Sequence, residues 1–104
     1  AGGYFVFLNT IRKFKETGLN VYLTELDVGS KASWSNNLAK QQAEQYYDVV
    51  KTALEGGVNL ISLWGIRDAN DPHWRTEEHP LLFDENYNKK PAYYSVREAL
   101  FEAN

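Results

Sequence analysis

The chain has 104 residues, enough for one domain with a modest core and too few for two. Its composition, with 43% hydrophobic and 24% charged residues, is that of a folded globular protein and argues against disorder. A net charge of −3 without a basic stripe argues against nucleic acid or an anionic membrane as a partner. The absence of cysteine excludes a disulfide scaffold, a thiolate metal site and a cysteine nucleophile.

The first predicted elements are a helix and a strand. Apolar residues recur at helical spacing in residues 4–14, and Gly18 follows where a helix C-terminus needs a stop. Residues 19–28 are apolar on both faces until their polar end. This pattern is typical of a buried parallel strand.

A loop and a second helix follow. Residues 29–37 are rich in Ser and Asn, and either Ser35 or Asn36 can cap the next helix. Residues 38–55 carry one apolar stripe, and the pair Gly56 and Gly57 closes the helix.

The last third of the chain is predicted to hold a strand, a long loop and a helix. Residues 58–66 form a second apolar run with a polar end, and residues 68–90 form a loop with two prolines. Pro91 suits the first turn of a final helix that ends near Glu102. Three tyrosines bracket the start of this helix and are expected to pack it against the sheet: Tyr87, Tyr93 and Tyr94.

The order helix, strand, helix, strand, helix predicts an α/β fold with a parallel sheet. A helix–strand spacing of roughly 35 to 40 residues fits consecutive units of a (β/α)8 barrel. Two strands cannot bury both faces of a sheet, so we expect residues 1–104 to be one part of such a barrel, with two parallel strands.

Two carboxylates lie near the end of the first predicted strand. Strict alternation would place Glu25 and Asp27 on the same face as Val21 and Leu23. If that face is the barrel interior, Glu25 stands at the catalytic mouth, where a carboxylate can attack an anomeric carbon. Spacing alone favours the other interpretation, that both residues are polar markers of a strand end.

Two tryptophans accompany the carboxylates. Trp64 lies at the corresponding end of the second predicted strand, and Trp74 lies in the loop that follows. Flat aromatic rings stack on sugar faces, although a tryptophan is more often a core residue. His73 and His79 lack the spacing of metal ligands, so we expect no metal site and no cofactor.

The combination of these residues resembles glycoside hydrolase family 10, the retaining endo-β-1,4-xylanases. Thr-Glu-Leu-Asp-Val at 24–28 is similar to the nucleophile motif of strand seven in that family. The other matching segments are Leu-Trp-Gly-Ile at 63–66 with Asp68, Trp74 with Arg75, and the C-terminal signature at 80–88 and 90–94. The resemblance runs from Ile11 to about Ala103.

The resemblance implies a (β/α)8 barrel in which this chain supplies helix six to helix eight. Glu25 is then the nucleophile, Trp64 and Trp74 line the sugar site, and Asp27 and Arg75 have supporting roles. The general acid/base of the family is a glutamate in an Asn-Glu motif that ends strand four, and this segment is not among the 104 residues. We therefore expect the chain to be inactive by itself.

The predicted function is retaining hydrolysis of xylan, with xylan or xylo-oligosaccharides as partners. The alternatives are a non-catalytic carbohydrate-binding or interaction protein derived from the barrel, and another retaining (β/α)8 glycosidase that acts on a β-glucan. We also expect self-association of the chain or its assembly with the missing barrel segment. The resemblance further implies a secreted, cell-surface or periplasmic location, with no signal peptide in these residues.

Overall fold

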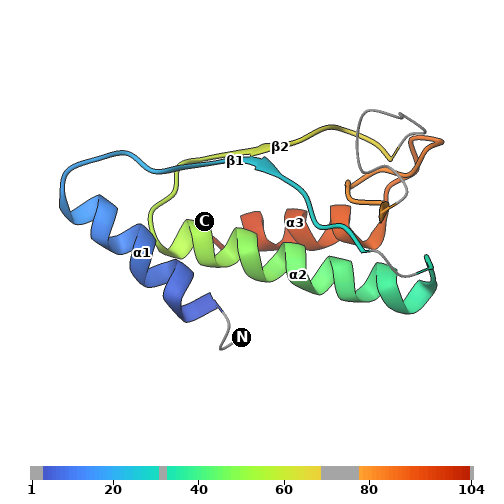
Figure 1. Ribbon diagram of the computed structural model, residues 1–104, viewed down its shortest axis with the longest axis horizontal. Helices are drawn as coiled ribbons and strands as arrows, with labels where there is room; N and C mark the ends of the chain where they lie inside the picture. The colour runs from blue at the N-terminus through green and yellow to red at the C-terminus, as the bar shows by residue number, and fades with distance from the viewer. Residues whose placement is uncertain (1–3, 31–32, 69–77, 104) are drawn as a thin grey trace.

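The computed structural model describes residues 4–30, 33–68 and 78–103. Two parallel strands lie along one side of the molecule, and α2 and α3 lie side by side beneath them (Figure 1). The elements in chain order are α1 (Phe5–Glu16), β1 (Tyr22–Leu26), α2 (Asn36–Glu55), β2 (Leu60–Leu63) and α3 (Pro91–Glu102). The predicted order of elements and the parallel pairing are thus confirmed.

The helices begin and end at the predicted signals. Gly18 follows α1 with φ of +84°, a left-handed conformation that glycine adopts without steric cost. The hydroxyl of Ser35 accepts a hydrogen bond from the backbone N–H of Leu38 at 3.2 Å, so Ser35 rather than Asn36 caps α2. Pro91 lies in the first turn of α3, as expected.

The strands are shorter than the apolar runs that predicted them. The ladder covers Tyr22–Leu26 and Leu60–Leu63, whereas the runs extend over residues 19–28 and 58–66. Apolar residues beyond the ladder still pack into the core; Val58, for example, is buried with Ile11. Burial thus continues past the hydrogen-bonded part of each strand.

The core lies between the sheet and the helices. Its larger cluster centres on Tyr46 and Val50 of α2, which pack with Leu26 and with Ala92 and Ala99 of α3. A smaller cluster joins α1 to α2 through Ile11, Ala53 and Val58. The prediction for the three tyrosines is wrong for two of them: Tyr93 packs against the core, whereas Tyr87 and Tyr94 are exposed.

The other face of the sheet has no helix over it in the described part of the chain. Several large apolar side chains of the sheet region are exposed: Tyr22, Leu60, Trp64 and Ile66. An apolar groove of about 250 Å³ runs beside β2, lined by residues of β2, α2 and α3. No helix in the described ranges is both long and apolar enough to span a membrane.

We predict that the 104-residue chain self-associates in solution, because this apolar face and the unpaired strand edges favour burial against another polypeptide. Sedimentation equilibrium measures the mass. Leu60→Lys, which places a charge on the exposed sheet face, should shift the distribution toward monomer. Phe5→Lys on α1, also at an exposed apolar position, should leave it unchanged. A monodisperse, folded monomer of the unmodified chain would contradict this prediction.

Candidate active site

Glu25 lies in a β-bulge at the end of β1. Between the ladder positions Leu23 and Leu26, β1 contains two residues, Thr24 and Glu25, where β2 contains only Ser62. Glu25 has φ of +57°, a left-handed backbone conformation that is uncommon outside glycine. Such a conformation costs about 1–3 kcal/mol and persists when its surroundings fix it, so it often marks a functional position.

The bulge changes the face that Glu25 occupies. Strict alternation placed Glu25 on the face of Val21 and Leu23, and this prediction is wrong. Both apolar residues pack toward the helices, as does the buried Leu26 after the bulge. The extra residue lets Glu25 remain exposed while Leu26 returns to the core. The carboxylate of Glu25 is therefore accessible from solvent.

Asp27 follows the bulge and is half-buried. It lies within electrostatic range of Tyr46: burial raises the pKa of the Tyr46 hydroxyl well above its ordinary value, and the charge of Asp27 raises it further. The Tyr46 hydroxyl donates a buried hydrogen bond to the carbonyl of Pro80. Asp27 is thus near the contact that ties α2 to the loop after β2.

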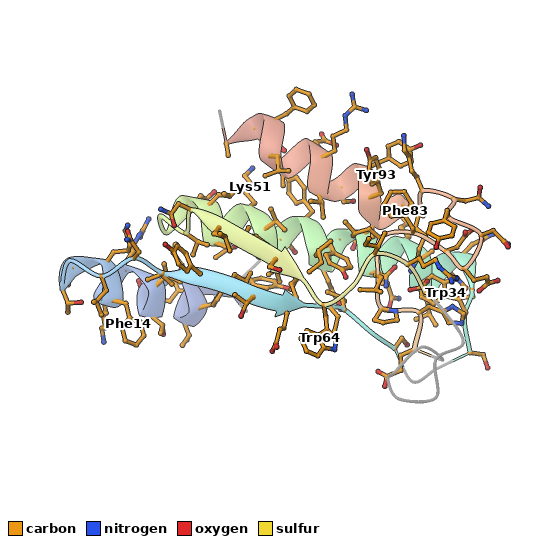
Figure 2. The ribbon with its side chains drawn as sticks, turned by 90° about the horizontal axis from the view of Figure 1, so that it is seen from above. Phe14, Trp34, Lys51, Trp64, Phe83 and Tyr93 are labelled. Atoms are coloured by element: carbon orange, nitrogen blue, oxygen red, sulfur yellow. The ribbon has the colours of Figure 1, made fainter. Side chains whose placement is uncertain are left out.

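Trp64 lies next to the bulge, at the exit of β2. Its backbone N–H donates to the carbonyl of Leu26 at 3.1 Å, so its backbone is fixed to the residue that follows Glu25. Its side chain is 46% exposed, and Figure 2 shows it near the end of the strands. A Cβ at Gly65 would lie 3.0 Å from the side chain of Leu81, so a larger residue at this position would crowd the turn beside Trp64.

The remaining predicted site residues, Trp74 and Arg75, lie outside the described residues, as does His73. Their roles stay predictions. In the described ranges there is no group of three or more His, Cys, Asp or Glu side chains placed to hold a metal ion.

A buried ion pair anchors the loop after β2. The Lys90 ammonium lies 2.7 Å from Oδ2 of Asp68 and also donates to the carbonyls of His79 and Leu81, at 2.9 Å and 2.7 Å. The other carboxylate oxygen of Asp68 accepts from the Leu81 N–H at 2.8 Å. Burial lowers the pKa of Lys90, and the charge and hydrogen bond of Asp68 oppose this shift.

Three further residues of this region were not predicted as site residues. Gln42, buried on α2, donates from Nε2 to the carbonyl of Val28 at 2.8 Å and to that of His79 at 2.6 Å. The imidazole of His79 stacks on Trp34, with ring centroids 4.9 Å apart, and the Lys90 ammonium lies 4.7 Å from the centroid of the Trp34 ring. Trp34 lies near the start of α2 (Figure 2).

One of these residues could have been found in the sequence. Gln42 immediately precedes Ala43 and lies four residues before Tyr46, so it falls on the apolar stripe of the helix. A polar side chain at such a position requires hydrogen-bond partners. No comparable signal exists for His79, whose position depends on the left-handed conformation that it adopts, with φ of +49°.

The chain matches the family model described as "Glycosyl hydrolase family 10" over residues 6–99. The match begins before Ile11, where the resemblance in the sequence starts, so it also covers residues 6–10. Among curated proteins, the chain is 35% identical to endo-1,4-beta-xylanase B of Thermotoga neapolitana, over 95% of this chain and 30% of the relative. It therefore spans less than a third of that relative's length.

Solved structures give the same result. Xylanase 10B of Thermotoga petrophila, in complex with xylobiose, superposes with a TM-score of 0.81 at 36% identity, over 92% of this chain and 31% of that one. Xylanase 10C of Cellvibrio japonicus, in complex with xylopentaose, has a TM-score of 0.74 at 32% identity, over 93% of this chain and 24% of that one. The fold is thus part of a (β/α)8 barrel. The chain belongs to glycosyl hydrolase family 10.

Proposed function

We propose that residues 1–104 form the C-terminal part of the catalytic domain of a retaining endo-β-1,4-xylanase, with Glu25 as its nucleophile. The observation that carries this proposal is the solvent-exposed carboxylate of Glu25, held in a left-handed bulge at the C-terminal end of β1. Active sites of (β/α)8 barrels lie at this end of the strands.

In the proposed reaction, a carboxylate oxygen of Glu25 attacks the anomeric carbon of the substrate and forms a glycosyl ester. The bond from that carbon to the glycosidic oxygen breaks, and a second carboxylic acid protonates the departing oxygen. Water then hydrolyses the ester, activated by the same group as a base. The two carboxyl groups of a retaining enzyme lie about 5–5.5 Å apart.

The second carboxylic acid is assigned to the Asn-Glu motif that ends strand four of the family barrel. No such motif occurs in these 104 residues, so the proposal includes the inactivity of the chain alone. General acid catalysis typically contributes 10² to 10⁴ in rate. Assembly with the remaining units of the barrel is then required for turnover.

Trp64 is assigned to the sugar site because its exposed side chain is one residue beyond β2 and its backbone is hydrogen-bonded next to Glu25. Trp74 is proposed as a second aromatic contact, with Arg75 and Asp27 in supporting roles.

Xylan is the proposed substrate, since the relatives described above are named xylanases. A secreted, cell-surface or periplasmic location follows from the same proposal, and no cofactor is required.

The proposal can be tested in a hybrid barrel: Thermotoga petrophila xylanase 10B whose matching segment is replaced by this chain. Glu25→Ala in the hybrid should reduce xylan turnover by about 10⁴-fold or more, because no ester can form. Release of reducing sugar measures turnover, and circular dichroism confirms that the variant is folded.

Glu98→Ala, at an exposed glutamate on α3, is the matched control and should retain activity. Activity near that of the unmodified hybrid in Glu25→Ala would contradict the assignment of the nucleophile. A folded hybrid that binds xylo-oligosaccharides without cleaving them would instead favour the non-catalytic alternative.

Trp64→Ala should lower kcat/KM on xylo-oligosaccharides by roughly fivefold or more, because an aromatic contact contributes about 1 kcal/mol beyond the area it buries. Tyr94→Ala removes a similarly exposed ring from α3 and should leave kcat/KM unchanged. If Trp64→Ala changes only the melting temperature, Trp64 is a structural residue and its place in the sugar site is wrong.

A further inference from the structure

The side-chain amide of Gln42 joins two segments that leave the strands. Gln42 is 4% exposed, and its Nε2 donates both hydrogens to backbone carbonyls. One carbonyl belongs to Val28, three residues after Glu25, and the other to His79, in the loop after β2. The backbone N–H of Val28 also donates to Pro80 at 3.2 Å, so the two segments contact each other directly at the same place.

The other end of the amide is poorly satisfied. Oε1 of Gln42 is buried and has no hydrogen-bond partner within the described ranges. An unsatisfied buried acceptor costs about 1–3 kcal/mol. An apolar side chain of similar shape would avoid this cost but would remove the hydrogen bonds to the carbonyls of Val28 and His79. What Gln42 supplies is the pair of donors to Val28 and His79.

The hydrogen bond from Gln42 to Val28 constrains the backbone segment that directly follows Glu25. Downstream of the bulge, the chain is held at Leu26, which is buried and accepts from the Trp64 N–H, and then at Val28, which accepts from Gln42. A left-handed conformation at a non-glycine residue persists only when its neighbours are held in place. Loss of the Gln42 contact removes one of the constraints on this segment, while the bond from the Val28 N–H to the Pro80 carbonyl remains.

We propose that Gln42 is a positioning residue for the nucleophile: its amide holds the backbone after Glu25 against the loop after β2 and thereby sets the direction of the carboxylate. The inference rests on the proposed role of Glu25. It assigns no contact between Gln42 and substrate. Its effect should therefore appear in the rate of ester formation and not in substrate affinity.

The test is the covalent step alone, in the hybrid barrel, with a fluorinated dinitrophenyl xylobioside as probe. The Glu25 carboxylate attacks the anomeric carbon, and dinitrophenolate leaves with the bonding electrons, so no acid is needed. Fluorine at the adjacent carbon slows hydrolysis of the ester, which mass spectrometry then detects on Glu25. Gln42→Met, which has similar volume and no donor, should label about 10- to 100-fold more slowly at saturation, with an unchanged half-saturating concentration.

Two control variants separate positioning from stability. Gln41→Met alters the exposed neighbour on the same helix and should label at the unmodified rate. Ile11→Ala creates a cavity in the smaller core cluster, which does not include Leu26, and should lower the melting temperature by more than Gln42→Met does, yet label normally per folded molecule. Gln42→Asn, with a shorter side chain, is the second test variant and should also label slowly.

Labelling of Gln42→Met and Gln42→Asn at the unmodified rate would overturn the inference, as would a failure of both to fold, because the residue would then act in folding. Absence of label on Glu25 in the unmodified hybrid would overturn the proposed nucleophile instead. The two failures are thus distinguishable.

Discussion

The arrangement of the candidate site depends on the buried contact between Lys90 and Asp68. All three ammonium hydrogens of Lys90 can be used, since one carboxylate oxygen and two backbone carbonyls lie within 2.9 Å. Removing one partner of a buried pair leaves an uncompensated charge, at a cost of about 3–5 kcal/mol. Lys90 is the N-cap residue of α3 and Asp68 follows β2, so the contact fixes Asp68 to the start of the last helix.

His79 connects this ion pair to the segment that follows the proposed nucleophile, Glu25. Its carbonyl accepts from both Lys90 and Gln42, and Gln42 also holds the carbonyl of Val28. The loop after β2 is thereby linked to the segment after β1 through side chains of α2 and through Lys90. Because Trp64 is hydrogen-bonded to Leu26 and Glu25 lies in the adjoining bulge, the positions of the proposed nucleophile and sugar platform are coupled.

The helices of this fold could be predicted because their signals are local: an apolar stripe, a serine cap and a stop at glycine. The ends of the strands could not, since residues such as Val58 are buried whether or not they join the ladder. The bulge in β1 also could not be predicted from the sequence. Val21, Leu23, Glu25 and Asp27 follow an alternating pattern in the sequence, and only pairing with the shorter segment of β2 breaks it.

The candidate site likewise combines features that the sequence predicts with features that it does not. Glu25 and Trp64 could be named because their motifs resemble those of the family, but their faces and contacts depend on partners far away in the sequence. Gln42 lies 14 residues from Val28 and 37 from His79, and neither separation carries a pattern. Long-range hydrogen bonds to backbone carbonyls place few demands on the identity of the residue that accepts them.

The contacts described here that hold Glu25 in place all come from this chain: the ladder with β2, the burial of Leu26 and the amide of Gln42. Within this chain, these contacts constrain the backbone orientation of the proposed nucleophile. The distance between Glu25 and a general acid on another strand has a different origin. It depends on how the remaining strands close the barrel. Changes around Lys90 and Gln42 should act on the direction of attack, whereas changes at the exposed sheet face should act on the separation of the two carboxyl groups.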